Sequence, residues 1–166
     1  MTPSQTTIFG YNAFISTATS GEVQFIELDA NGKYPVGIYY FLKGKAQLHV
    51  QETNEVLVDR TPGWLNSEHA SENAATPGTL VCTFAEDSTW IVIPFVGNSN
   101  VLPTVQSLSL APASSTLISS GEKWFLGEGS VVINGTTFTG PVEIPVQVAD
   151  TQCVATTQSY ILKIAG

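Results

Sequence analysis

Apolar and polar residues alternate along most of the chain. One such stretch is 22–28, and another is 46–50, which reads Ala46-Gln-Leu-His-Val. A period of two is typical of β-strands, because successive side chains point to opposite faces of a sheet. The runs are short and rich in β-branched and aromatic residues, which also favours strands. Further runs of this kind lie at 55–59, 79–84, 90–93, 107–110, 130–133, 142–148 and 160–164.

Turn signals separate these runs at short intervals. Asn134-Gly135 predicts a two-residue hairpin, because both turn positions favour positive φ. The polar stretch 66–75 is the exception to the pattern and predicts a surface loop with a local helix. Many short, evenly spaced strands predict an all-β fold, an antiparallel jelly-roll or β-sandwich. Other turn signals are Ser20-Gly21, Asn31-Gly32, Lys43-Gly44, Pro62-Gly63, Pro77-Gly78, Gly97-Asn98 and Ser120-Gly121.

The region 98–103 predicts a joint between two β units, 1–98 and a smaller unit 99–166 packed on the first, or else a single merged domain. Residues 39–48 resemble residues 124–133, since each run has an aromatic strand, a glycine turn and an alternating strand. Each half also closes with a strand-turn-strand, at 80–94 and 153–164. The likeness indicates either an internal repeat or the general similarity of any two β-hairpins.

The stretch Tyr40-Phe-Leu-Lys-Gly-Lys-Ala-Gln-Leu-His-Val resembles the centre of a cupin, and a Pro-Gly turn and a closing strand pair follow it as in that family. The resemblance implies two cupin-like jelly-roll halves. Metal-dependent cupins place two histidines and a glutamate before the glycine turn, and a third histidine in a later strand. Here residues 31–40 contain no histidine and no acid, and residues 115–127 offer only Glu122. Neither a metal nor another cofactor is therefore predicted.

The charge balance excludes several classes of partner. Fourteen acidic residues face six basic ones, which gives a net charge of −8. Nucleic acids and anionic membranes both attract basic surfaces, so neither is an expected partner. Apolar runs stay well short of the roughly 20 residues that a membrane-spanning helix needs. Residues 1–10 lack the basic and apolar regions of a secretory signal, so secretion by a signal peptide is not expected.

Few residues are candidates for chemistry. His49 alternates with core positions and is expected on the outer side of a strand. His69 lies between Glu68 and Glu72, where the three side chains could form a weak metal or pH-sensing cluster. The acidic pair 86–87 is expected at a solvated hairpin tip rather than in a glycosidase-like site.

Nucleophile and nucleotide signatures are missing from the sequence. Cys82 and Cys153 lie within apolar runs and are expected to be buried thiols, with a single disulfide between them as the less favoured alternative. There is no G-x-S-x-G elbow, no P-loop and no dinucleotide fingerprint. We therefore expect a protein that is not an enzyme.

Aromatic residues are the remaining lead. Tyr39, Tyr40, Trp64 and Trp124 are candidate interface or ligand-contacting side chains, and the alternative is that large aromatics fill the core. Core packing is favoured for Trp90 and Trp124. Trp64 follows a Pro-Gly turn and is expected to be exposed.

These features favour a non-catalytic structural or assembly protein, such as a bacteriophage capsid decoration (cement) protein or a tail protein. That interpretation predicts a homo-oligomer, with a trimer favoured, which contacts other virion proteins such as the capsid shell. It also predicts location in the virion, with the cytoplasm as the alternative. The competing hypothesis is a metal-free cupin-like protein that binds a small molecule or a carbohydrate.

Overall fold

The computed structural model describes residues 2–26, 37–66, 79–95 and 103–165, and every regular element in these ranges is a β-strand. The chain divides into two compact units. The first comprises Met1–Thr7 and Tyr11–Leu102, and the second comprises Ile8–Gly10 and Pro103–Gly166. No helix that could span a membrane is present in the described ranges.

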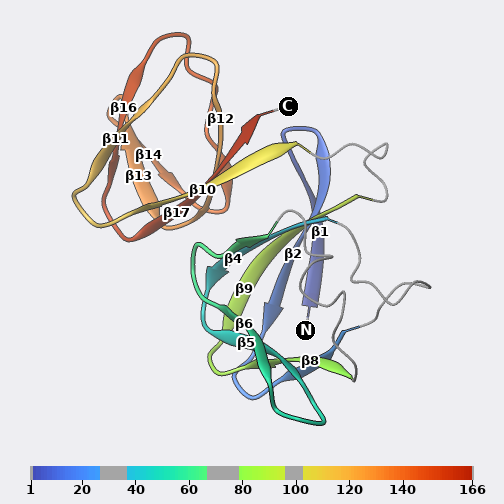
Figure 1. Ribbon diagram of the computed structural model, residues 1–166. Coiled ribbons are helices and arrows are strands. Elements are labelled where there is room, and N and C mark those ends of the chain that lie inside the picture. Colours follow the sequence, from blue (N-terminus) through green and yellow to red (C-terminus); the bar gives the residue numbers. More distant parts are fainter. Residues whose placement is uncertain (1, 27–36, 67–78, 96–102, 166) are drawn as a thin grey trace. The chain divides into compact units, whose positions relative to one another are not determined.

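The first nine strands form two sheets (Figure 1). One sheet has the order β1-β2-β9-β4-β7 and the other the order β3-β8-β5-β6. The strands are β1 (Thr2–Ile8), β2 (Tyr11–Ala18), β3 (Val23–Phe25), β4 (Gly37–Lys43), β5 (Ala46–Val50), β6 (Val56–Arg60), β7 (Leu65–Asn66), β8 (Leu80–Phe84) and β9 (Ser88–Pro94).

The remaining eight strands, coloured yellow to red in Figure 1, form two further sheets, with the orders β10-β17-β12-β15 and β11-β16-β13-β14. These strands are β10 (Thr104–Leu110), β11 (Ser115–Ile118), β12 (Lys123–Glu128), β13 (Ser130–Ile133), β14 (Thr136–Thr139), β15 (Val142–Glu143), β16 (Thr151–Ala155) and β17 (Ser159–Ala165).

The two halves have the same topology. The order β2-β9-β4-β7 matches β10-β17-β12-β15, and β3-β8-β5-β6 matches β11-β16-β13-β14, so β1 is the one strand without a counterpart. Each half is thus an eight-stranded antiparallel jelly-roll of two facing four-stranded sheets. The predicted all-β jelly-roll fold with two repeated halves is confirmed.

Strand register places the halves in residue-by-residue correspondence. Phe41 pairs with Trp90, and the β4–β9 register shifts immediately afterwards; Leu126 pairs with Ile161, and the β12–β17 register shifts at the same point. A glycine with positive φ follows each shift, Gly44 in the first half and Gly129 in the second. A shared β-bulge at one position indicates a true internal repeat rather than the general likeness of hairpins.

Several predicted features lie outside the described residues. These are the turns at 31–32, 77–78 and 97–98, nearly all of the stretch 66–75 with its predicted local helix, and most of the joint at 98–103. Of the stretch 66–75, the structure describes Asn66, which belongs to β7.

The predicted hairpin at Asn134-Gly135 is present. Ile133 pairs with Thr136, and the two turn residues have φ of 50° and 76°. Nothing lies within 4 Å of a Cβ added at Gly135, so only the backbone conformation opposes a side chain there.

Gly135→Val is therefore expected to lower the free energy of unfolding by roughly 1 kcal/mol or more, because β-branched residues resist positive φ. Gly135→Asn is the matched control, since asparagine tolerates this region and should cost less. Urea denaturation of both variants measures the difference, and equal midpoints for the valine variant and the native protein would show that the turn is placed wrongly.

Candidate functional site

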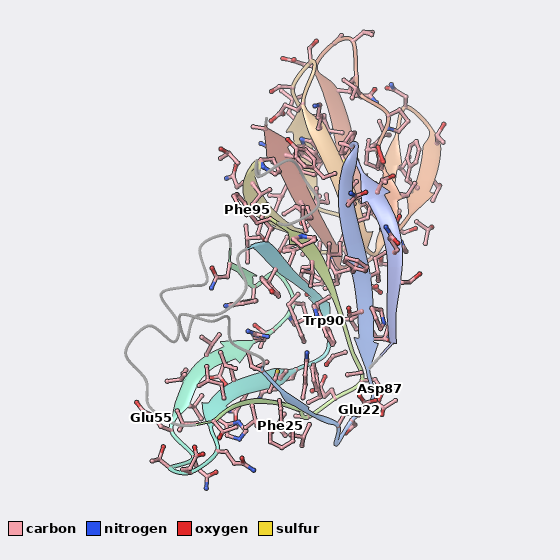
Figure 2. All side chains as sticks on the ribbon, turned by 90° about the vertical axis from the view of Figure 1, so that its right-hand side faces the viewer. Glu22, Phe25, Glu55, Asp87, Trp90 and Phe95 are labelled. Carbon is pink, nitrogen blue, oxygen red and sulfur yellow. The ribbon has the colours of Figure 1, made fainter. Side chains whose placement is uncertain are left out.

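Large aromatic side chains fill the interior of the first half. Trp90 stacks on Phe84, with ring centroids 5.1 Å apart, and on Phe41, at 6.3 Å. Figure 2 shows Trp90 within the first half, whereas Phe25 of β3 points outward. A second cluster of Leu48, Val50 and Leu80 packs beside Tyr39. Among the described residues, these two clusters pack between the two sheets and form the core of the first half.

Trp64 is half-buried rather than exposed, because it packs against the same core. The guanidinium carbon of Arg60 lies 4.7 Å from the Trp64 ring centroid, a cation–π arrangement. Arg60, the last residue of the edge strand β6, is buried, and its Nη1 donates a 4.0 Å hydrogen bond to Cys82 Sγ. The sequence alone did not reveal the contact between Arg60 and Trp64, because it depends on the return of the chain through the Pro62-Gly63 turn.

Trp124 occupies the core of the second half and is 1% exposed. Its Nε1 is buried and has no hydrogen-bond partner among the described residues. The ammonium of Lys163 lies 5.5 Å from the ring centroid. Core packing, the favoured alternative for Trp124, is what the structure shows.

The four candidate aromatics have different surroundings. Tyr39 packs in the core of the first half, and Tyr40, its fully buried neighbour in β4, points to the opposite face of the sheet. Trp64 contacts Arg60, and Trp124 lies in the other unit. A binding role for any of the four remains a prediction.

Of the two histidines, the structure describes one, His49. His49 lies on the outer face of β5, between the buried Leu48 and Val50. Glu52 Oε2 accepts a hydrogen bond from the backbone N–H of Thr79 at 2.8 Å, and the hydrogen bonding to Thr79 holds the pKa of Glu52 below its ordinary value. His69, Glu68 and Glu72 lie outside the described residues. Within the described part of the chain, no three potential ligands gather around a metal position.

Both cysteines are buried thiols outside any disulfide, as predicted, so the alternative of a disulfide between them is wrong. They occupy equivalent positions: Cys82 pairs with Leu48 in the first half, and Cys153 pairs with Ile133 in the second. Burial raises the pKa of Cys153 to about 11, which keeps the thiol protonated and unreactive at neutral pH.

An open polar pocket of about 260 Å³ lies at one end of the first half. Strand pairing sets Thr17 and Lys43 on either side of Thr89, so two hydroxyls and an ammonium form a row across β2, β9 and β4. The pocket is lined by Thr17, Ala18, Thr19, Glu22, Lys43, Asp87, Ser88 and Thr89.

Two acids complete this pocket, and Figure 2 shows Glu22 and Asp87 close together. Glu22 Oε1 accepts hydrogen bonds from Thr19 N at 3.0 Å and from Thr19 Oγ1 at 2.9 Å. Asp87 Oδ1 accepts a hydrogen bond from Ser20 N at 2.8 Å. The predicted hairpin tip at 86–87 is present, but it also forms a wall of the pocket, which the sequence did not indicate.

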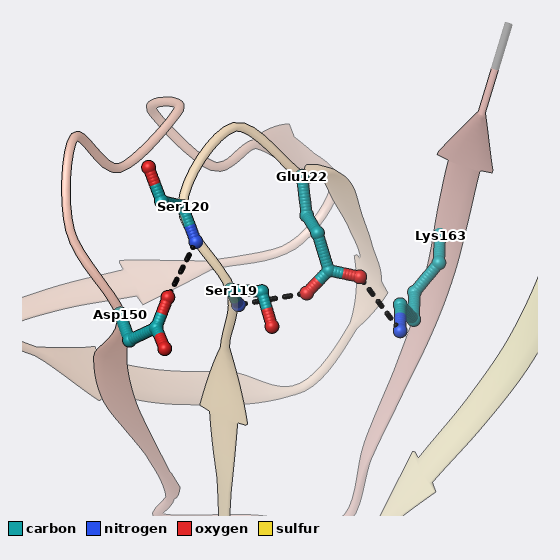
Figure 3. Close-up of polar contacts among 5 residues, drawn as sticks. All are labelled: Ser119, Ser120, Glu122, Asp150 and Lys163. Carbon is teal, nitrogen blue, oxygen red and sulfur yellow. Dashed lines mark hydrogen bonds and ion pairs between the residues drawn. The ribbon is translucent and has the colours of Figure 1, made fainter.

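The second unit contains the same kind of turn, in which two successive backbone N–H groups donate to two carboxylates (Figure 3). Ser119 N donates to Glu122 Oε1 at 2.7 Å, and Ser120 N donates to Asp150 Oδ1 at 2.9 Å. Here Glu122 Oε2 also forms a 2.9 Å ion pair with Lys163. The sequence signature of both turns is Ser or Thr, then Ser-Gly-Glu, at 19–22 and 119–122.

The ion pair makes a specific prediction about pH. The hydrogen bond from Lys163 lowers the pKa of Glu122. A carboxyl whose pKa is lower in the folded than in the unfolded state stabilises the fold above the unfolded-state pKa. This stabilisation is lost as the pH falls through the folded-state pKa. Both side chains are more than a quarter exposed, so Glu122→Gln should cost less than about 1 kcal/mol at neutral pH. Urea denaturation should show that the loss of unfolding free energy in Glu122→Gln vanishes in acid. Glu143→Gln, at an exposed position, serves as the control. A deficit that persists in acid contradicts this interpretation.

Comparison with known proteins adds fold neighbours but no family. A conserved protein of unknown function from Pseudomonas aeruginosa PAO1 is 10% identical, with a TM-score of 0.47 over 94% of this chain and 81% of that one. A salicylate 1,2-dioxygenase from Pseudaminobacter salicylatoxidans is 11% identical, with a TM-score of 0.41 over 93% and 70%. A regulatory subunit of a cAMP-independent protein kinase A from Trypanosoma cruzi, bound to guanosine, is 13% identical, with a TM-score of 0.34 over 92% and 72%.

No protein-family model and no curated protein matches the chain. At these identities and TM-scores the structural likenesses carry no argument about function. The fold assignment rests on the strand order of the two halves.

Proposed function

We propose that this chain is a non-catalytic assembly protein, which functions by associating with copies of itself and with other proteins through its outer surface. The observation that carries this is the filled interior of both jelly-roll halves, by the Trp90 stack in the first and by Trp124 in the second. Ligand-binding β-barrels keep a cavity at this place. With that space occupied by core, the outer surface is left for contacts.

The edges of the sheets support association. An edge strand presents unpaired backbone N–H and C=O groups, and proteins that stay monomeric usually protect such edges with charged residues or proline. Among the described edge strands, the two-residue β7 and four longer strands contain no charged residue and no proline. The four longer ones are β3, β10, β11 and β14.

The particle or compartment in which the protein would assemble is a different question from whether it assembles. The prediction of a bacteriophage virion component, located in the virion and in contact with its shell or tail, rests on composition, and neither the fold nor the comparisons add support to it. The predicted trimer is likewise untested. Self-association is the part for which the structure supplies physical reasons.

The molecular mass in solution tests this function. Light scattering on a sizing column, over a wide dilution range, should give a homo-oligomer whose mass does not change with concentration. A clean monomer at every concentration would overturn self-association and leave ligand binding as the better explanation.

The polar pocket supports a second candidate function, the binding of a small polar molecule. Hydroxyls, an ammonium and two carboxylates converge there, and such groups give a ligand orientation and specificity. A sugar or a zwitterion fits this mixture of donors and acceptors better than an apolar compound.

A thermal-shift screen with monosaccharides and amino acids tests this second candidate, because a ligand that binds the folded state raises the melting temperature. Lys43→Gln should abolish any shift, whereas Lys45→Gln, two residues away and outside the pocket, should retain it. No shift with any compound, or equal shifts in both variants, contradicts binding at this pocket.

A further inference from the structure

The sheet β11-β16-β13-β14 carries no charge. None of the residues in its four strands is charged at neutral pH, since its sole ionisable group, the Cys153 thiol, stays protonated. Each of the other three sheets contains at least one charged residue. In a chain with a net charge of −8, a whole sheet without charge is a distinct surface feature.

One face of this sheet is open to solvent. Val131, Ile133 and Cys153 point into the core, so their neighbours along the strands point outward. Register aligns Ser115, Val154, Val132 and Thr137 in one row across all four strands. Ser115 and Thr137 are exposed, and the two central valines are half-buried. We call these outward residues, with Leu117, Gln152 and Thr139, the neutral face.

Exposed apolar side chains extend the neutral face at one end. Leu117 in β11 is 55% exposed and Val148 is 98% exposed. The loop that carries Val148 is tied to the turn after β11, because Ser120 Oγ donates to the Val148 carbonyl at 3.0 Å. The acid next to this end is Asp150, whose Oδ1 accepts a hydrogen bond from Ser120 N.

We propose that the neutral face packs against the neutral face of a second copy of this chain. The inference rests on the proposed self-association and names its surface. Two copies with a net charge of −8 repel each other, so their contact is most favourable where neither presents a carboxylate. Uncharged strands that expose leucine, valine, threonine and glutamine are self-complementary in this sense. A face that packs on itself gives two-fold symmetry, and hence a dimer or a higher even-numbered assembly in place of the predicted trimer.

Charge insertion tests the surface. Gln152→Glu changes the amide to a carboxylate of the same shape in the middle of the neutral face. Leu117→Glu replaces an apolar side chain by a carboxylate at the edge of that face. Like charges brought together across an interface are costly, so each variant should raise the dissociation constant about tenfold or more. Light scattering gives the mass. An unchanged melting profile of the dissociated variant shows that it is folded.

Two matched controls separate this face from the rest of the surface. Phe25 occupies the position in β3 that Leu117 occupies in β11 and is 58% exposed, so Phe25→Glu is the control for Leu117→Glu. Gln106→Glu, at an exposed position of β10, is the control for Gln152→Glu. Phe25 and Gln106 lie in β3 and β10, two of the uncharged edge strands, so an unchanged mass of both control variants assigns the contact to the neutral face rather than to these edges.

The outcomes are distinct. A native oligomer that only the Gln152 and Leu117 variants dissociate supports the neutral face as the contact. A native oligomer that neither variant weakens, or that Phe25→Glu alone dissociates, overturns this surface and leaves self-association standing. A native protein that is monomeric overturns self-association itself, and the contact with it.

Discussion

Replacing Gly129 by alanine is expected to lower the free energy of unfolding by roughly 3 kcal/mol or more, because backbone strain of about 1–2 kcal/mol adds to overpacking of about 1–3 kcal/mol. Gly129 has φ of +101°, and an added Cβ would meet Ser159 Oγ, the Gln158 carbonyl oxygen at 2.5 Å and Ser159 Cα at 2.7 Å. Two of these atoms are backbone, so the clash cannot be relieved by turning a side chain. Urea denaturation monitored by fluorescence measures the loss.

The repeat supplies a second test of the same kind. Gly44 has φ of +90°, and a Cβ there would meet Ser88 Oγ, the Asp87 carbonyl and Ser88 Cα, which are the equivalent atoms of the first half. Gly44→Ala should therefore destabilise the protein to a similar extent. Gly121→Ala is the control, because its φ is +81° and nothing lies within 4 Å of the added Cβ. Equal losses at Gly121 and Gly129 would show that backbone strain alone is at work.

Truncation of Trp124 should also have a large effect. A tryptophan that is 1% exposed leaves a large cavity when replaced by alanine, and such substitutions cost about 3–5 kcal/mol. The loss should appear as a lower midpoint in thermal or urea melts.

Trp64→Ala is the informative comparison for Trp124→Ala. Trp64 is half-buried, so its truncation should cost clearly less, although it also removes the contact with Arg60. If Trp124→Ala is as stable as the native protein, the second half does not pack around this residue and the filled interior is wrong.

The alternation of apolar and polar residues was sufficient to predict the fold class, because it identifies the side chains of each strand that face the core. Leu48 and Val50 face inward while His49 faces outward, as the pattern predicts. The likeness of residues 39–48 to residues 124–133 proved to reflect equivalent strands, turns and bulges. Local rules of pleat and turn carry this information, and they do not depend on distant contacts.

The candidate surfaces depend on distant contacts and were not predictable in the same way. The polar pocket joins Thr19 and Glu22 to Asp87, more than sixty residues away, through the pairing of β2 with β9. The neutral face arises because four strands without charge become neighbours in one sheet. Each strand is unremarkable alone, and only the strand order shows that they share a face.

Hydrogen–deuterium exchange of the native protein beside its Gln152→Glu variant tests most directly whether copies meet at the neutral face. Self-association there predicts slow exchange in β11 and β14, the edges of that sheet, in the native protein and faster exchange in the variant. Exchange in β3, the equivalent edge of the first half, should be the same in both. Equal rates in β11 and β14 for the two proteins, with the native protein assembled, would contradict the account.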